Sequence, residues 1–222
     1  MLQSHRCRIF PVLVWLVAAS CGCSGIYYKT MEAFGYHKRD ILVSSVEKAR
    51  DSQEEAKEQF QTALEKFTSL INFKGGELED TYNKLNDEYE ESKDRAEAVS
   101  GRIEDVEEVA DALFQEWEGE LDAYSNERLR SLSEEKLQNT RSRYSKLIGA
   151  MKHAEAKIEP VLKAFGDQVL FLKHNLNARA IDSLKDELVS VETDVASLIK
   201  DMEASVNEAN QFIDQITQED SA

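Results

Sequence analysis

The only thiols of the chain lie within its first 23 residues, at Cys7, Cys21 and Cys23. A cysteine can be acylated, form a disulfide or bind a metal, and each of these outcomes needs particular neighbours. Because no cysteine follows Cys23, the remainder of the chain can form neither a disulfide framework nor a thiolate metal site. The chemistry open to these cysteines therefore depends on the N-terminal segment itself.

That segment has the three-part layout of a secretory signal peptide. Arg6 and Arg8 precede an apolar run over residues 9–19, and small residues with cysteines follow. The run is shorter than the roughly 20 residues that a membrane-spanning helix needs. We therefore expect a signal peptide over residues 1–20, followed by an anchor and tether over residues 21–38.

The end of the signal peptide resembles a bacterial lipobox, in which small residues precede a cysteine that becomes acylated. Residues 18–20 (Ala-Ala-Ser) precede Cys21, and Gly22 precedes Cys23, so either cysteine fits. The alternative is an ordinary secretory cleavage that leaves both thiols unmodified. Acyl chains would hold the protein firmly on lipid, because each buried methylene contributes about 0.8 kcal/mol. No Asp follows either cysteine, and resemblance to sorted lipoproteins then implies the inner leaflet of the outer membrane, facing the periplasm.

Residues downstream that could carry catalysis are scattered. The histidines lie far apart, at His5, His37, His153 and His174, and none belongs to an HExxH or Glu-x-x-His motif. The sequence has no nucleophile signature, phosphate-binding glycine loop or dinucleotide fingerprint. We therefore expect no catalytic residues, no metal site and no cofactor, and we expect that the protein is not an enzyme.

One polar, partly basic cluster stands out in the acidic chain. Its members are Lys173, His174, Asn175, Asn177 and Arg179, which we call the basic cluster. The functional interpretation is a partner-binding tip. The alternative is a helix–turn–helix in which the asparagines cap helices and the basic side chains offset the helix dipole.

The composition predicts that long amphipathic helices position these residues. Only 9 Gly and 2 Pro interrupt 222 residues, while 32% of residues are charged. The net charge is −16, and it becomes −18 without residues 1–20, which hold two Arg and no acid. A body this acidic is a poor match for nucleic acid. We expect an all-α fold, an elongated antiparallel helical bundle or coiled coil of about four long helices.

Apolar residues recur in alternating steps of three and four over four stretches. The first includes Phe60 and Phe67 and ends before Gly75-Gly76, and the second runs from Leu78 to Tyr124. The third starts after a capping box formed by Ser131 and Glu134 and contains Pro160, which should kink or interrupt it. The fourth runs from Ile181 to Ile216.

Short connections between these stretches make neighbouring helices antiparallel. A turn is expected over residues 173–177, although a single helix from 133 to 217 is the alternative. We expect the bundle domain to span residues 39–217 and a disordered tail to span residues 218–222.

Four motifs resemble one family of proteobacterial lipoproteins, known as domain of unknown function 2959. They are CSGIYY at 23–28, HKRDILV at 37–43, FKGG at 73–76 and VLFLKHNLNA at 169–178. The resemblance covers essentially the whole chain after the signal peptide. It aligns the single lipobox cysteine of the family with Cys23 and implies architecture and location only.

Together these observations lead us to expect a lipoprotein that acts as a non-catalytic helical scaffold, spacer or adaptor in the cell envelope. Its partners would be membrane lipid, through the acylated cysteine, and an envelope protein or peptidoglycan. The alternative is a helical module that binds a ligand, metal or peptide, for which inward-facing polar residues would be needed. A homo-oligomer would form if an apolar stretch stays unfilled within one chain.

Overall fold

The computed structural model describes residues 38–73 and 78–221, and these residues form helices joined by short connections. The helices are α2 (Lys38–Ile71), α3 (Leu78–Leu121), α4 (Glu127–His174), α5 (Ala178–Ser183) and α6 (Lys185–Ser221). Residues 39–222 form one compact unit. The described part of the chain has no strand, so the expected all-α class is confirmed.

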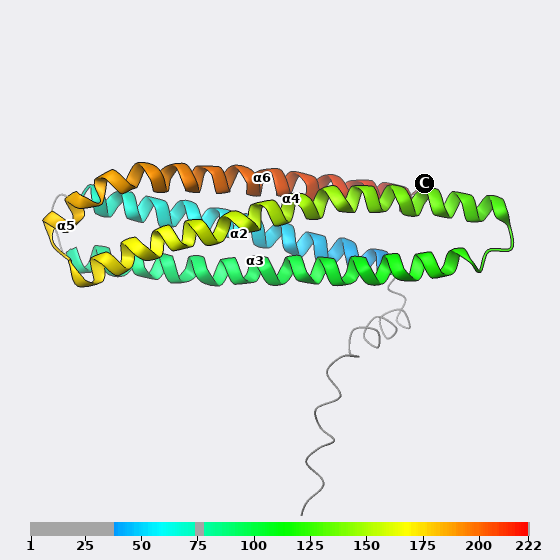
Figure 1. Cartoon of the computed structure of the whole chain (residues 1–222), viewed down its shortest axis with the longest axis horizontal. Helices are drawn as coiled ribbons and strands as arrows, with labels where there is room; N and C mark the ends of the chain where they lie inside the picture. Colours follow the sequence, from blue (N-terminus) through cyan, green and yellow to red (C-terminus); the bar gives the residue numbers. More distant parts are fainter. Residues whose placement is uncertain (1–37, 74–77, 222) are drawn as a thin grey trace, which may run out of the picture. The chain divides into compact units, whose positions relative to one another are not determined.

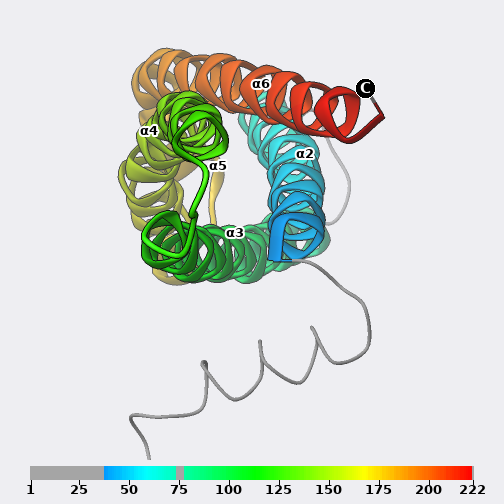
Figure 2. The ribbon, with the colours of Figure 1, turned by 90° about the vertical axis from the view of Figure 1, so that its right-hand side faces the viewer.

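The four long helices lie at the corners of a square, each antiparallel to its two neighbours (Figures 1 and 2). α2 lies between α3 and α6, and α4 lies diagonally across from α2. This up-down-up-down order is the simplest one for four helices with short connections. The expected antiparallel bundle of four long helices is therefore confirmed.

The core is a column of apolar side chains along the axis of the square. The seam positions of α2 are buried from Val46 to Leu70, with at most 1% exposure. The rings of Phe67 and Phe165 meet edge to face across the diagonal, with centroids 6.2 Å apart. Such aromatic pairs add to the burial of apolar area that drives helix association.

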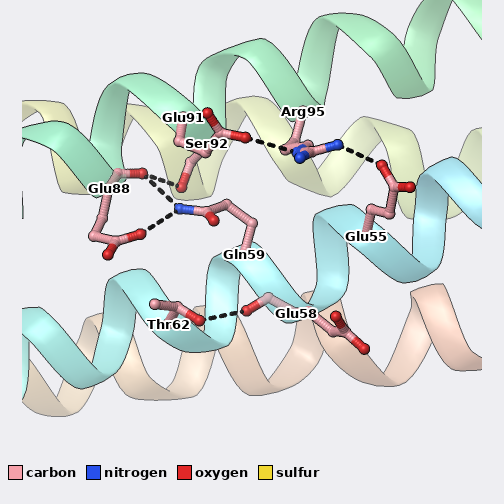
Figure 3. Close-up of polar contacts among 8 residues, drawn as sticks. All are labelled: Glu55, Glu58, Gln59, Thr62, Glu88, Glu91, Ser92 and Arg95. Atoms are coloured by element: carbon pink, nitrogen blue, oxygen red, sulfur yellow. Dashed lines mark hydrogen bonds and ion pairs between the residues drawn. The ribbon is translucent and has the colours of Figure 1, made fainter.

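Polar contacts along the edges of the square set the register of neighbouring helices. Between α2 and α3, the side-chain amide of Gln59 donates to the backbone carbonyl and the carboxylate of Glu88, at 3.0 and 2.8 Å (Figure 3). The guanidinium of Arg95 joins Glu91 on its own helix to Glu55 on α2. These half-exposed contacts specify alignment more than they add stability.

The third helix begins earlier than expected. Its N-cap is Asn126, whose side-chain oxygen accepts hydrogen bonds from the backbone N–H groups of Arg128 and Leu129. The capping box predicted at Ser131 and Glu134 is therefore wrong, and both residues lie inside α4. α4 also continues through Pro160 to His174 without interruption.

The connection between the last two long helices is a real turn. α4 ends at His174, and the short helix α5 leads into α6, so the single helix over residues 133–217 does not occur. α6 continues to Ser221, where we expected a disordered tail from residue 218. Gly75-Gly76 lies outside the described residues, but the chain reverses direction between α2 and α3.

None of the described helices contains an apolar stretch long enough to cross a membrane.

Candidate functional site

The basic cluster lies at the end of the bundle where α4 turns into α6 (Figure 1). Lys173 and His174 form the last turn of α4, and Arg179 lies in the first turn of α5. All three side chains are exposed. Positive charge at the C-terminus of a helix is favourable because the helix dipole is negative there.

The two asparagines of the cluster are engaged in shaping the turn. Asn175 caps α4, and its side-chain amide donates to the carbonyl of Phe171 at 3.0 Å. The side-chain oxygen of Asn177 accepts from the backbone N–H groups of Arg179 and Ala180, both at 3.1 Å. The capping role that the sequence suggested for them is confirmed. What the cluster offers to a partner is therefore its three basic side chains.

Two exposed apolar residues lie beside the basic cluster, and the sequence patterns did not identify them as exposed. In the run from Val169 to Leu172, Val169 and Leu172 are buried, whereas Leu170 is 58% and Phe171 39% exposed. Four consecutive apolar residues cannot all point to one side of a helix, and that signal was available in the sequence. The end of the bundle thus combines basic charge with exposed apolar area, a combination typical of interaction surfaces.

An open groove of 540 Å³ runs from this end along the outer face of α3 and α4. Lys173 lines its end, and Leu162, Val169 and Leu170 line its apolar part. Tyr89 from α3 packs against Gly166, where an added Cβ would lie 2.7 Å from the tyrosine hydroxyl. The groove is open to solvent, so it resembles a surface for an extended partner more than an enclosed ligand pocket.

Inside the bundle, the core holds few polar groups. Ser92 and Thr140 donate to backbone carbonyls of their own helices, at 2.7 and 2.9 Å. Gln53 and Ser205 are fully buried and bonded to each other, with Ser205 Oγ donating to Gln53 Oε1 at 2.6 Å. This pair links α2 to α6 and is too small a cluster to hold a ligand by itself.

Many charged groups in the described helices form ion pairs, among them Arg95 with Glu55, Arg141 with Glu118 and Lys157 with Asp201. Burial, with the nearby carboxylates Glu107 and Asp111, raises the pKa of Tyr144, which packs edge to face on Phe114. A tyrosine held protonated on an apolar partner is a packing residue. Within the described residues, no three His, Cys, Asp or Glu side chains come together to hold a metal ion.

Cys21 and Cys23 lie outside the described residues, so the acylation prediction stays a prediction. His37 also lies outside them. His153 and His174 are on different turns of α4, and His153 approaches Asp201 on α6, with Nε2 to Oδ2 at 3.2 Å.

The fold and its surfaces define a class, a four-helix bundle of long acidic helices with a basic turn at one end. Comparison with known proteins then gives the family. The chain belongs to the family described as "Protein of unknown function (DUF2959)", whose model matches residues 27–216. The family inferred from the motifs is thus confirmed, and three of the four motifs lie wholly within the match, while the lipoprotein character stays a prediction. No curated protein matches the chain.

Proposed function

We propose that this protein is a non-catalytic helical scaffold, spacer or adaptor of the bacterial cell envelope, anchored to lipid by an acylated Cys21 or Cys23. The observation that supports the proposal most is the character of the core. Its long seams are apolar, and the fully buried side chains of Gln53 and Ser205 bond to each other between α2 and α6. A bundle built in this way resists bending over its length and leaves its surface for contacts.

The length of the helices supports the spacer role. α4 has 48 residues, and at about 1.5 Å per residue it spans roughly 70 Å. A bundle of that length would separate an anchored end from the basic cluster. We propose that the basic cluster contacts an envelope protein or peptidoglycan, and that the anchor lies in the inner leaflet of the outer membrane, facing the periplasm.

Metabolic labelling with palmitate tests the anchor. Single variants Cys21→Ala and Cys23→Ala are compared in cells, and membranes are then separated on a density gradient. We expect one variant to lose the label and to leave the outer-membrane fraction, while the other keeps both. A label that persists in the double variant, or that is absent from the natural chain, would contradict the proposed anchor.

Crosslinking in intact envelopes, followed by mass spectrometry, tests the basic cluster. The variant with Lys173, His174 and Arg179 replaced by Ala should lose the crosslinked partner. The control replaces Lys48 and Lys146, which are exposed and belong to no ion pair in the described structure, and so removes the same two permanent charges. Equal loss of the crosslinked partner in both variants would show that binding depends on the net charge of the protein and not on the basic cluster.

The groove beside Lys173 favours a second function, a module that binds a peptide. Its mixed apolar and polar lining is suited to an extended chain. In that case, Lys163→Glu, an exposed change within the groove, should abolish the crosslink, whereas replacing Arg179 alone should preserve it. The opposite pattern would favour the basic cluster.

A further inference from the structure

The opposite end of the bundle carries its own exposed apolar residues. Between Phe114 and Leu137 no residue is buried, and we call residues 115–136 the hairpin tip. Tyr124, Leu129 and Leu132 are 42%, 52% and 47% exposed there. The α3–α4 hairpin extends beyond the start of α2 and the end of α6, so no other described helix lies beside its outer part (Figure 1).

The exposed leucines of the hairpin tip share one side of α4. Leu129 and Leu132 are three residues apart, a spacing that brings side chains together on a helix. Tyr124 lies in the turn that precedes α4. Scattered exposed leucines are ordinary on a protein surface, but apolar side chains gathered at a projecting end indicate a contact.

The local charge also differs from that of the rest of the bundle. Residues 123–133 hold one acid, Glu127, and two bases, Arg128 and Arg130, whereas the chain as a whole carries −16. Arg130 lies 3.8 Å from Glu127. The apex of the hairpin tip, residues 123–133, is therefore less acidic than the arms of α3 and α4 behind it, so phosphate groups would repel the apex less than the arms.

The chain enters the bundle close to the base of the hairpin tip. The guanidinium of Arg39, at the start of α2, lies 5.7 Å from the ring centre of Trp117. The indole N–H of Trp117 in turn donates to the hydroxyl of Ser133 at 2.8 Å. The start of α2 and both arms of the hairpin therefore meet at this point.

The segment that precedes α2 is long enough for the hairpin tip to reach the anchoring membrane. An extended chain spans at most about 3.3–3.6 Å per residue, so the 15 residues from Cys23 to Lys38 span up to roughly 50 Å. From Ser133 to Glu127 the hairpin projects on the order of 10 Å, at about 1.5 Å per residue. The segment that ends at the acylated cysteine and the hairpin tip can thus touch the same membrane surface.

We propose that the hairpin tip lays Tyr124, Leu129 and Leu132 on the surface of the lipid bilayer that holds the acylated cysteine. The occupant is zwitterionic phospholipid, since the acidic helices behind the tip disfavour an anionic surface. Leucine and tyrosine suit the boundary between lipid and water. The apolar side chains of leucine and the tyrosine ring can enter the lipid, while the tyrosine hydroxyl stays in contact with water. This inference rests on the proposed lipid anchor. Two attachments would stand the bundle upright, with the basic cluster directed away from the membrane.

Fluorescence quenching by brominated phosphatidylcholine tests the contact. The mature acylated chain carries Trp117→Phe and one new tryptophan, at Leu129 or, as the control, at Val189. Val189 is 67% exposed, near the start of α6 at the other end of the bundle. In phosphatidylcholine vesicles we expect several-fold stronger quenching for Leu129→Trp than for Val189→Trp. Equal quenching would overturn the inference.

Two further measurements keep the anchor and the contact distinguishable. Flotation with vesicles tests the anchor alone, and a chain that fails to float contradicts the proposed function. A chain that floats without quenching at Leu129 contradicts only the membrane contact. If Trp117→Phe disturbs folding, hydrogen exchange of the natural chain replaces the fluorescence, and vesicles should slow exchange in the hairpin tip. Slowing that depends instead on the density of protein would indicate contact between two copies and would overturn the inference.

Discussion

Gln53 occupies a core position that every other residue of its seam fills with an apolar side chain. It is fully buried, and its side-chain oxygen accepts from Ser205, while its Nε2 has no hydrogen-bond partner among the described residues. A buried polar pair contributes little net stability, but it costs free energy when one partner is lost. The pair therefore penalises any other alignment of α2 and α6, as single buried polar residues do in coiled coils.

Removing one member of this pair should destabilise the bundle more than removing both. We expect Ser205→Ala to lower the free energy of unfolding by about 1–3 kcal/mol, because the Gln53 carboxamide is then left unpaired. Gln53→Leu combined with Ser205→Ala should recover most of that loss. Urea denaturation of the natural chain, both single variants and the double variant completes the cycle. Additive losses would show that the pair is uncoupled.

Gly166 is the helical glycine whose surroundings leave no room for a side chain. An added Cβ would meet the hydroxyl of Tyr89 at 2.7 Å, whereas nothing lies within 4 Å of the same position at Gly149. Both glycines lie inside α4, so alanine improves helix propensity at both by about 1 kcal/mol. We expect Gly149→Ala to stabilise the protein by nearly that amount and Gly166→Ala to gain less or to destabilise it. Equal gains in denaturation experiments would show that Tyr89 moves aside freely.

Residue types alone identified much of the core but less of the surface. Three-four spacing placed Phe60, Phe67 and Phe165 correctly, because an amphipathic helix has one buried face. The sequence did not predict that Leu170 and Leu129 are exposed. The spacing of apolar residues indicates which face of a helix a residue occupies, but not whether another helix covers that face. Cys21 and Cys23 lie outside the described residues, and their acylation stays a prediction.

At the scale of elements, the first residue of α4 depends on which of two possible N-caps forms. The sequence offered Ser131 with Glu134, but Asn126 caps α4 five residues earlier through two backbone N–H groups. An asparagine is as good an N-cap as a serine, so propensity could not decide between them. The helix extends because the arm of α3 continues opposite it and Ser133 bonds to Trp117.

The choice of cap makes a direct prediction. Asn126→Ala should lower the free energy of unfolding, or the local stability of the first turn of α4, by about 1 kcal/mol, because two backbone N–H groups lose their acceptor. Ser131→Ala lies within the helix and should be neutral or slightly stabilising. Amide exchange of residues 127–130 in both variants measures the difference. A larger loss of stability in Ser131→Ala than in Asn126→Ala would mean that Ser131, and not Asn126, caps the helix.

An ion-pair cluster joins α4 to α6 and makes their contact sensitive to acid. The Lys157 ammonium bonds to Asp201 and lowers the pKa of that carboxyl below its usual 3.8, with smaller contributions from His153 and Lys200. Lys157 also bonds to Ser197 at 2.9 Å. Because the pKa is lower in the folded state, the stabilisation is present above the unfolded value and is lost as the pH falls below it.

Asp201→Asn should therefore destabilise the bundle at neutral pH by a modest amount that disappears in acid. The difference from the natural chain is expected to be constant above about pH 5 and to shrink as the pH drops below the ordinary carboxyl value. Denaturant titrations at several pH values measure it. Asp214, exposed on the same helix, serves as the control, and its Asn variant should show no comparable loss. A difference that persists in strong acid would mean that packing, rather than charge, is responsible.

At the scale of the whole molecule, the sequence predicted the architecture because the order of helices leaves few choices. Long helices with short connections and one apolar seam each must pair with antiparallel neighbours. The sequence predicted stretches of unequal length, but it did not predict that α3 and α4 extend past α2 and α6 at one end, since a seam does not state where its partner ends. That mismatch produces the hairpin tip, where α3 and α4 continue without α2 and α6 (Figure 1).

The same mismatch predicts a gradient of stability along the bundle. In the middle, residues 96–110 of α3 include six buried positions: Ala96, Val99, Ile103, Val106, Val109 and Ala110. In the hairpin tip no residue is buried from 115 to 136. Amide hydrogens open more readily where little apolar area holds a segment, so residues 118–132 should exchange orders of magnitude faster than residues 96–110. Peptide-resolved hydrogen exchange of the protein in solution measures both within one helix pair. Equal protection would mean that the two arms stabilise each other without a four-helix core, and the tip would then be a rigid extension rather than the most readily opened part of the bundle.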